Sequence, residues 1–161
     1  MKHLLITIVF LLGSFFAKAQ TELWQKQLLQ KVNDLRQKGC KCGRKTYPAA
    51  PKLTWDAQLE SSAASHAVDM FKNKYFEHNS LNGKNYSDRI EAAGYHWKSS
   101  GENIANGQVN VTDVFNDWKK STSHCENMMN KDFQNMGAAQ VKDYWVQDFG
   151  AKFPVKKQNL Q

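Results

Sequence analysis

The sequence predicts one α+β domain, in which a small sheet lies between layers of helices. Apolar residues recur at helical spacing through most of the chain, whereas the clearest β-hairpin, residues 134–149 around Lys142-Asp143, comes near the end. Aromatic side chains on both faces of this hairpin indicate that both faces are covered. A chain of 161 residues is long enough to bury the core of such a domain.

Residues 1–19 have the pattern of a secretory signal peptide. A positively charged start precedes an almost wholly apolar run, and Ala17-Lys18-Ala19 matches the small-x-small cleavage pattern. The apolar run is too short to span a bilayer comfortably. We therefore predict cleavage after Ala19, a domain over residues 20–151 and a polar tail over residues 152–161. The expected location is secreted or periplasmic, without a transmembrane anchor.

Removal of residues 1–19, which contain Lys2 and Lys18 and no acid, lowers the formal net charge from +7 to +5. This charge favours anionic surfaces such as cell walls, lipid headgroups or polysaccharide, although dispersed lysines also serve solubility alone. No basic run is interleaved with aromatic residues, so nucleic acid is not an expected partner.

An amphipathic helix is the first element expected after the signal peptide. Trp24, Leu28, Val32 and Leu35 fall three or four residues apart, and the helix is predicted to end at Gly39. Residues 40–51 contain two prolines and a glycine and are therefore predicted to form a loop.

Three cysteines, Cys40, Cys42 and Cys125, follow the signal peptide of a chain whose expected compartment permits disulfides. Cys40 and Cys42 are too close in sequence to bond without strain, so a bridge should join one of them to Cys125. The sequence leaves that choice open, and Cys42–Cys125 is the working assignment. Such a bridge should stabilise the fold by roughly 3–5 kcal/mol. A Cys-x-Cys metal site is the alternative, but it lacks the longer spacer typical of structural zinc.

A second amphipathic helix is predicted from its N-cap, Asp56, to about Lys74. Its apolar stripe comprises Leu59, Ala63, His66, Ala67 and Met70. His66 therefore points inward, and we expect a hydrogen-bonded core histidine rather than a ligand.

Short elements follow this helix. His78 falls on a connection that leads into the turn signal Asn82-Gly83, where polar side chains can project into a cleft. A short helix is predicted over residues 87–93, and Ile104 with Ala105 suits a short buried strand.

Two further helices precede the hairpin. The first covers residues 111–120, with Thr112 as the expected cap. The second is predicted to start at Ser123, because Ser123 and Glu126 match an S-x-x-E capping box. This start places His124 at the first helical position, where the positive end of the helix disfavours imidazolium and keeps the ring neutral.

His78, Glu102 and His124 are the residues that best explain a functional site. Glu102 lies in a small, apolar run, and a buried carboxylate needs a partner. Two imidazoles and one carboxylate match the ligand set of many zinc sites that keep an open position. We therefore predict that these three side chains meet in one cavity and hold a divalent metal.

Other chemistries have less support in the sequence. The chain contains no H-E-x-x-H, G-x-S-x-G, P-loop or GxGxxG motif. Paired carboxylates for glycoside hydrolysis need a second inward acid, and Glu102 has no evident one. Cys125 as a nucleophile is less favoured than Cys125 in a structural disulfide.

These residues occur within motifs that resemble the CAP superfamily, or SCP domains, which includes cysteine-rich secretory proteins, insect venom allergens and plant pathogenesis-related proteins. The resemblance extends from Leu28 to Phe149, and Val32 stands where the first family motif usually has a histidine. The matching segments, in chain order, are Asn33-Asp34-Leu35-Arg36, Ser65-His66-Ala67, Phe76-Glu77-His78-Asn79-Ser80, Gly101-Glu102-Asn103-Ile104, Trp118-x-x-Ser121-x-x-His124 with Asn127-Met128, and Tyr144-Trp145-Val146-Gln147-Asp148-Phe149.

The resemblance implies a three-layer α-β-α sandwich with a small antiparallel sheet and a central cavity lined by two histidines and two acids. His78, His124 and Glu102 match three of these positions, and Ser121 stands at the fourth, where eukaryotic relatives have the second acid. Family members have been linked to zinc, to sterol or fatty-acid binding, and to disputed peptidase activity.

The leading hypothesis is a secreted binding module whose His78, Glu102, Ser121 and His124 cavity holds Zn²⁺ and an extracellular ligand, such as a lipid or a cell-wall component. A second hypothesis is a metal-assisted hydrolase of peptide, peptidoglycan or ester bonds. A third is a polar cluster that only cross-links the core.

Overall fold

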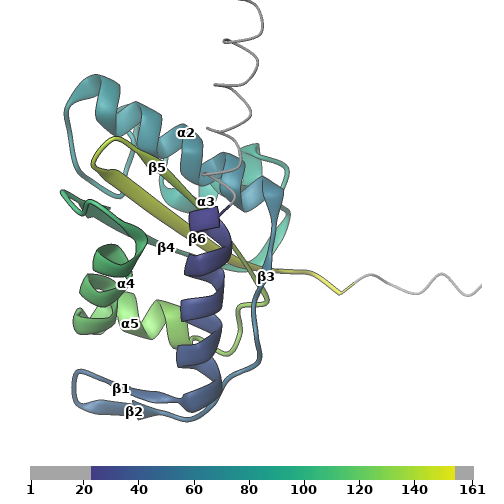
Figure 1. The fold of residues 1–161 in the computed structure, drawn as a ribbon. Helices are drawn as coiled ribbons and strands as arrows, with labels where there is room; N and C mark the ends of the chain where they lie inside the picture. Colours follow the sequence, from purple (N-terminus) through teal and green to yellow (C-terminus); the bar gives the residue numbers. More distant parts are fainter. Residues whose placement is uncertain (1–22, 155–161) are drawn as a thin grey trace, which may run out of the picture.

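The computed structural model describes residues 23–154, so the predicted signal peptide and most of the predicted tail lie outside it. Figure 1 shows a four-stranded sheet between two layers of helices, as the α+β prediction requires. The strand order is β3-β5-β6-β4, and the sheet is antiparallel except for the short parallel pair β3–β5. The strands are β3 (Thr54–Trp55), β4 (Trp97–Asn106), β5 (Asn135–Val141) and β6 (Tyr144–Lys152).

The helices α2 (Ala57–Asn73) and α3 (Tyr86–Ala92) form one layer. The Asp56 side chain caps α2 by accepting from two backbone N–H groups, and the predicted apolar stripe of this helix is buried. Gly137 on β5 permits the close contact with α2, because a Cβ atom there would lie 2.1 Å from the backbone N of Glu60. The predicted position and inner face of this helix are therefore confirmed.

The other layer contains an N-terminal helix, described over residues 23–38, together with α4 (Val111–Lys120) and α5 (Thr122–Met129). The largest apolar cluster lies between this layer and the sheet. Asn110 caps α4 by accepting from the backbone N–H groups of Thr112 and Asp113, so the predicted cap at Thr112 is wrong. No helix within residues 23–154 has the length and apolarity needed to cross a membrane.

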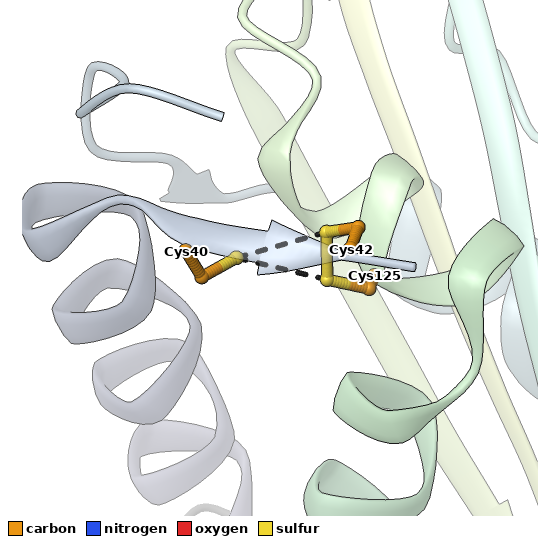
Figure 2. Close-up of side chains that lie close together, drawn as sticks. All are labelled: Cys40, Cys42 and Cys125. Carbon is orange, nitrogen blue, oxygen red and sulfur yellow. Dashed lines mark hydrogen bonds between the residues drawn. A yellow bond between two sulfur atoms is a disulfide. The ribbon is translucent and has the colours of Figure 1, made fainter. Parts of the chain in front are cut away.

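Residues 40–47 form a β-hairpin rather than the predicted loop. Strand β1 (Cys40–Cys42) pairs antiparallel with β2 (Lys45–Tyr47), and Gly43, at φ +56°, provides the left-handed turn between them. A disulfide joins Cys42 to Cys125 of α5, with a Cα–Cα distance of 5.6 Å (Figure 2). This bond confirms the working assignment, and Cys40 keeps a free thiol.

Strand β4 forms one edge of the sheet and is much longer than the predicted strand at residues 104–105. Two of its carbonyl groups are occupied by side chains from the helices beside it. Trp118 Nε1 donates to the carbonyl of Ile104 at 3.2 Å, and Asn127 Nδ2 donates to that of Glu102 at 3.0 Å. Because these carbonyls are not used in the ladder with β6, Glu102 and its partner Asp148 form the closer, non-hydrogen-bonded type of cross-strand pair.

Candidate functional site

The candidate site is built around the carboxylate of Glu102, whose side chain is fully buried. Its Oε1 lies 2.8 Å from His78 Nδ1, and its Oε2 lies 2.6 Å from Arg89 Nη2. A buried ionised carboxylate needs a compensating charge, which Arg89 supplies. Both oxygens of Glu102 are therefore engaged, one by a cation and one by an imidazole.

Arg89 is a site residue that sequence reasoning missed. It lies in α3, and the N-cap of that helix, Asn85, forms a capping box with Asp88. Its Nη1 donates to Ser80 Oγ and to the carbonyl of Lys84, both at 3.2 Å. These contacts fix the guanidinium between the 80–84 turn and the sheet, and a single arginine in a short polar helix carries no sequence signal for this role.

A second acid, Asp148, stands beside Glu102, so the expectation that Glu102 has no acidic neighbour is wrong. The two residues face each other across the β4–β6 ladder, and Asp148 is fully buried. Burial, followed by the charge of Glu102, raises the pKa of the Asp148 carboxyl well above its usual 3.8, and Ser62 and Arg89 offset this only in part. Burial therefore favours the protonated, neutral form of the Asp148 carboxyl.

His66 supports the segment that carries His78. Its Nε2 lies 2.9 Å from the carbonyl of Glu77, so Nε2–H donates to the backbone immediately before His78. The ring is buried, and burial lowers its pKa, which keeps it neutral. The prediction of a hydrogen-bonded core histidine is confirmed.

His78 lies on the connection after α2, and its side chain is 51% exposed. The contact with Glu102 orients Nδ1 toward the carboxylate, which accepts the Nδ1–H hydrogen bond. In the neutral ring, this arrangement leaves the lone pair on Nε2, on the other side of the ring, available to a ligand.

His124 is half-buried in α5. The helix begins at Thr122 with Ser121 as its N-cap and without a side-chain capping bond, so the predicted start at Ser123 and its capping box are wrong. His124 is consequently the third helical residue. Burial, followed by the charge of His78, lowers the pKa of its imidazole, so the ring is neutral as expected, but mainly because it is buried.

Side chains of β4 and α5 tie the backbone of His124 to β4, at the residue that follows Glu102. Asn103 Nδ2 donates to the carbonyl of His124 at 3.2 Å, and Asn127 Nδ2 donates to Asn103 Oδ1 at 2.9 Å. Ser121, the fourth predicted cavity residue, is half-buried, and its Oγ lies 3.5 Å from Ser123 Oγ.

The structure brings the side chains of His78 and Glu102 into direct contact, and the nearby His78 contributes to the lowered pKa of His124. Within residues 23–154, one group of three potential metal-ligating side chains (His, Cys, Asp or Glu) has all its ligand atoms within 4.8 Å of one another. It comprises Cys40, Cys42 and Cys125, and the last two are joined in the disulfide. A shared role of His78, Glu102 and His124 as metal ligands stays a prediction. With both its oxygens engaged, Glu102 suits the role of a hydrogen-bond partner to His78 better than that of a direct ligand.

A polar pocket of about 430 Å³ lies beside α2 and α3 and is lined by Arg89, but not by His78, Glu102, Ser121 or His124. Arg89, His66, Lys84 and Asp69 line it together with four serines, Ser61, Ser62, Ser65 and Ser80. Arg89 therefore contacts both the pocket and Glu102.

Comparisons with known proteins identify relatives of this fold. The profile of the cysteine-rich secretory protein family, CAP, matches residues 29–149. YkwD of Bacillus subtilis is 30% identical over 138 residues, which are 84% of this chain and 50% of YkwD. A second relative, the B. subtilis membrane protein YlbC, is 30% identical over 125 residues, which are 78% of this chain and 34% of YlbC. An outer surface protein of Borrelia burgdorferi superposes with a TM-score of 0.72 at 26% identity, covering 83% of this chain and 96% of that one. NaASP2, solved with Zn²⁺, has a TM-score of 0.55 at 15% identity and covers 81% and 80%.

Proposed function

The chain belongs to the cysteine-rich secretory protein family, CAP, and from that premise we propose that it is an extracellular binding module that holds a divalent metal, zinc, at His78 and His124. The contact between His78 Nδ1 and the buried Glu102 carboxylate, at 2.8 Å, carries the proposal. Histidine ligands of zinc commonly donate their second ring N–H to a carboxylate, which fixes the tautomer and orients the ring.

Each residue of the predicted set then has a distinct role. His78 offers Nε2, and His124 offers a neutral imidazole because its pKa is lowered. Glu102 acts through His78 as a positioning residue, and Arg89 supplies the positive charge beside Glu102. A bound zinc ion would supply a Lewis acid with positions open to an oxygen ligand. NaASP2, which shares the fold at 15% identity, was solved with Zn²⁺.

The extracellular ligand is proposed to be a polar cell-wall component rather than a lipid. The pocket beside Arg89 is lined mainly by serine hydroxyls and by charged side chains of both signs, Arg89, Lys84 and Asp69, which suit a hydroxyl-rich ligand better than an acyl chain. A hydrolase with Glu102 as general base is less favoured, because the Glu102 side chain is fully buried and each of its oxygens already has a partner.

Zinc binding by the oxidised, disulfide-bonded protein tests the proposal. After equilibration with zinc and removal of free ions, elemental analysis should find one zinc per chain in the wild type. A variant with His78→Ala and His124→Ala should retain none, whereas His96→Ala should bind like the wild type, because His96 is exposed and paired with Glu91. Absence of zinc in the wild type, or equal uptake by the double variant, would defeat the proposal and favour a purely structural cluster.

A further inference from the structure

We propose that Cys40, Cys42 and Cys125 form a thiol–disulfide exchange centre, in which Cys40 relays electrons from an external dithiol to the buried Cys42–Cys125 bond. Cys125 follows His124 in α5, but the exchange uses neither histidine and does not depend on metal binding. Three observations carry the proposal: the difference in burial among the sulfurs, the distances between them, and the position of two of them on one strand.

Access to the bond is asymmetric. Cys42 is 1% exposed and Cys125 is fully buried, so an external thiol cannot reach either sulfur directly in the folded protein. Cys40 is only half-buried. Exchange requires a thiolate to attack a sulfur atom, so access decides which sulfur reacts first. Cys40 is therefore the cysteine of this cluster that external thiols can contact.

The free thiol lies against the disulfide. Cys40 Sγ is 3.6 Å from Cys42 Sγ and 3.6 Å from Cys125 Sγ, as the dashed lines in Figure 2 show. Residues two apart on a strand point to the same side, which is why β1 presents both of its cysteines to α5. Equal distances place Cys40 Sγ beside the bond, and a rotation about its Cα–Cβ bond is needed to align it for attack.

Attack on Cys125 is favoured over attack on Cys42. Two residues apart on a strand, Cys40 and Cys42 have Cα atoms separated by roughly 6.6 Å, near the upper limit for a disulfide. Cys125 lies on another element and already bridges to β1 with a Cα–Cα distance of 5.6 Å. The expected isomer therefore joins Cys40 to Cys125 and releases Cys42.

The exchange conserves atoms and electrons at each step. The Cys40 thiolate attacks Cys125 Sγ, the Cys40–Cys125 bond forms, and Cys42 leaves as a thiolate that takes up a proton. A thiolate of the dithiol then attacks Cys40 Sγ and expels the Cys125 thiolate. The second thiol of the dithiol closes its own disulfide and frees Cys40, so two electrons pass to the protein. Burial raises the pKa of the Cys40 thiol, and Lys119 on α4 opposes this increase.

The rate at which dithiothreitol reduces the folded protein tests the relay. Samples are quenched with an alkylating reagent, and the mass shift reports the number of free thiols. We expect Cys40→Ser to lose the Cys42–Cys125 bond at least about tenfold more slowly than the wild type, because direct attack must await local opening. Thr46→Ala, at an exposed position paired with Lys41 in the same hairpin, should react like the wild type. Equal rates for the wild type and Cys40→Ser would overturn the proposal.

A second variant tests the isomer directly. Cys42→Ser should form a Cys40–Cys125 bond on oxidation, and trypsin cleavage at Lys41 separates position 40 from position 42 for mass-spectrometric assignment. Recovery of Cys40 and Cys125 only as free thiols after oxidation would contradict the relay, whatever the behaviour of Cys40→Ser.

Discussion

Replacing Arg89 by methionine would remove the cation that compensates Glu102 while keeping an unbranched side chain of similar reach. The two side chains are 7% and 0% exposed, so water cannot solvate the carboxylate that is left behind. Breaking a buried ion pair by removing one partner costs about 3–5 kcal/mol. The hydrogen bonds from Arg89 to Ser80 and to the Lys84 carbonyl are lost as well. We expect a loss of unfolding free energy within that range.

A double-mutant cycle separates the ion pair from general disruption of the core. Glu102→Gln removes the charge that Arg89 compensates, so Arg89→Met should cost about 1–3 kcal/mol less in that background than in the wild type. Urea unfolding followed by tryptophan fluorescence measures all four proteins. The reasoning is refuted if Arg89→Met costs the same in both backgrounds, or if it costs less than about 1 kcal/mol in the wild type.

Three further predictions concern other parts of the fold. Replacing both Cys42 and Cys125 by serine opens a loop with a sequence separation of 83. The free energy of unfolding, measured in urea, should fall by about 4–5 kcal/mol. A loss below about 1 kcal/mol would contradict the chain-entropy account. Gly137→Ala places a Cβ atom 2.1 Å from the backbone N of Glu60 and should lower the free energy of unfolding by about 3 kcal/mol or more. Thermal unfolding measures this loss, and an unchanged midpoint would show that α2 can shift freely. The raised pKa of Asp148 means that the folded state holds a proton that the unfolded chain releases above pH 3.8, so this residue lowers stability as pH rises from about 4 toward neutrality. Asp148→Asn should therefore gain stability relative to the wild type over that range, and a difference that is constant with pH would count against the assignment.

Features set by short-range patterns can be predicted from the sequence. The helix after Asp56 shows both its cap and its apolar stripe within 18 residues, and the final hairpin shows its turn and its alternation. The inward orientation of His66 follows from the same periodicity. Such features depend on neighbours along one element, so one sequence is sufficient to find them.

The features that the sequence does not reveal depend on contacts between elements. The sequence places Asp148 on a strand, but its position opposite Glu102 is a matter of register, which is set when β4 and β6 pair. Arg89 becomes the counter-ion of Glu102 only once α3 packs against the sheet. The start of α5 is mispredicted because Ser121 and Ser123 offer competing starts of the same chemistry, and the local pattern favours the wrong one.

The side chains along the free edge of β4 have a consequence for self-association. An exposed edge strand is a template on which a second chain can add a strand, and such addition leads to aggregation. At Glu102 and Ile104 the acceptors that an incoming strand would need are already taken by Asn127 and Trp118. The helices α4 and α5 therefore also block intermolecular strand pairing at the middle of this edge. A high local concentration of the domain should not lead to fibril formation through β4.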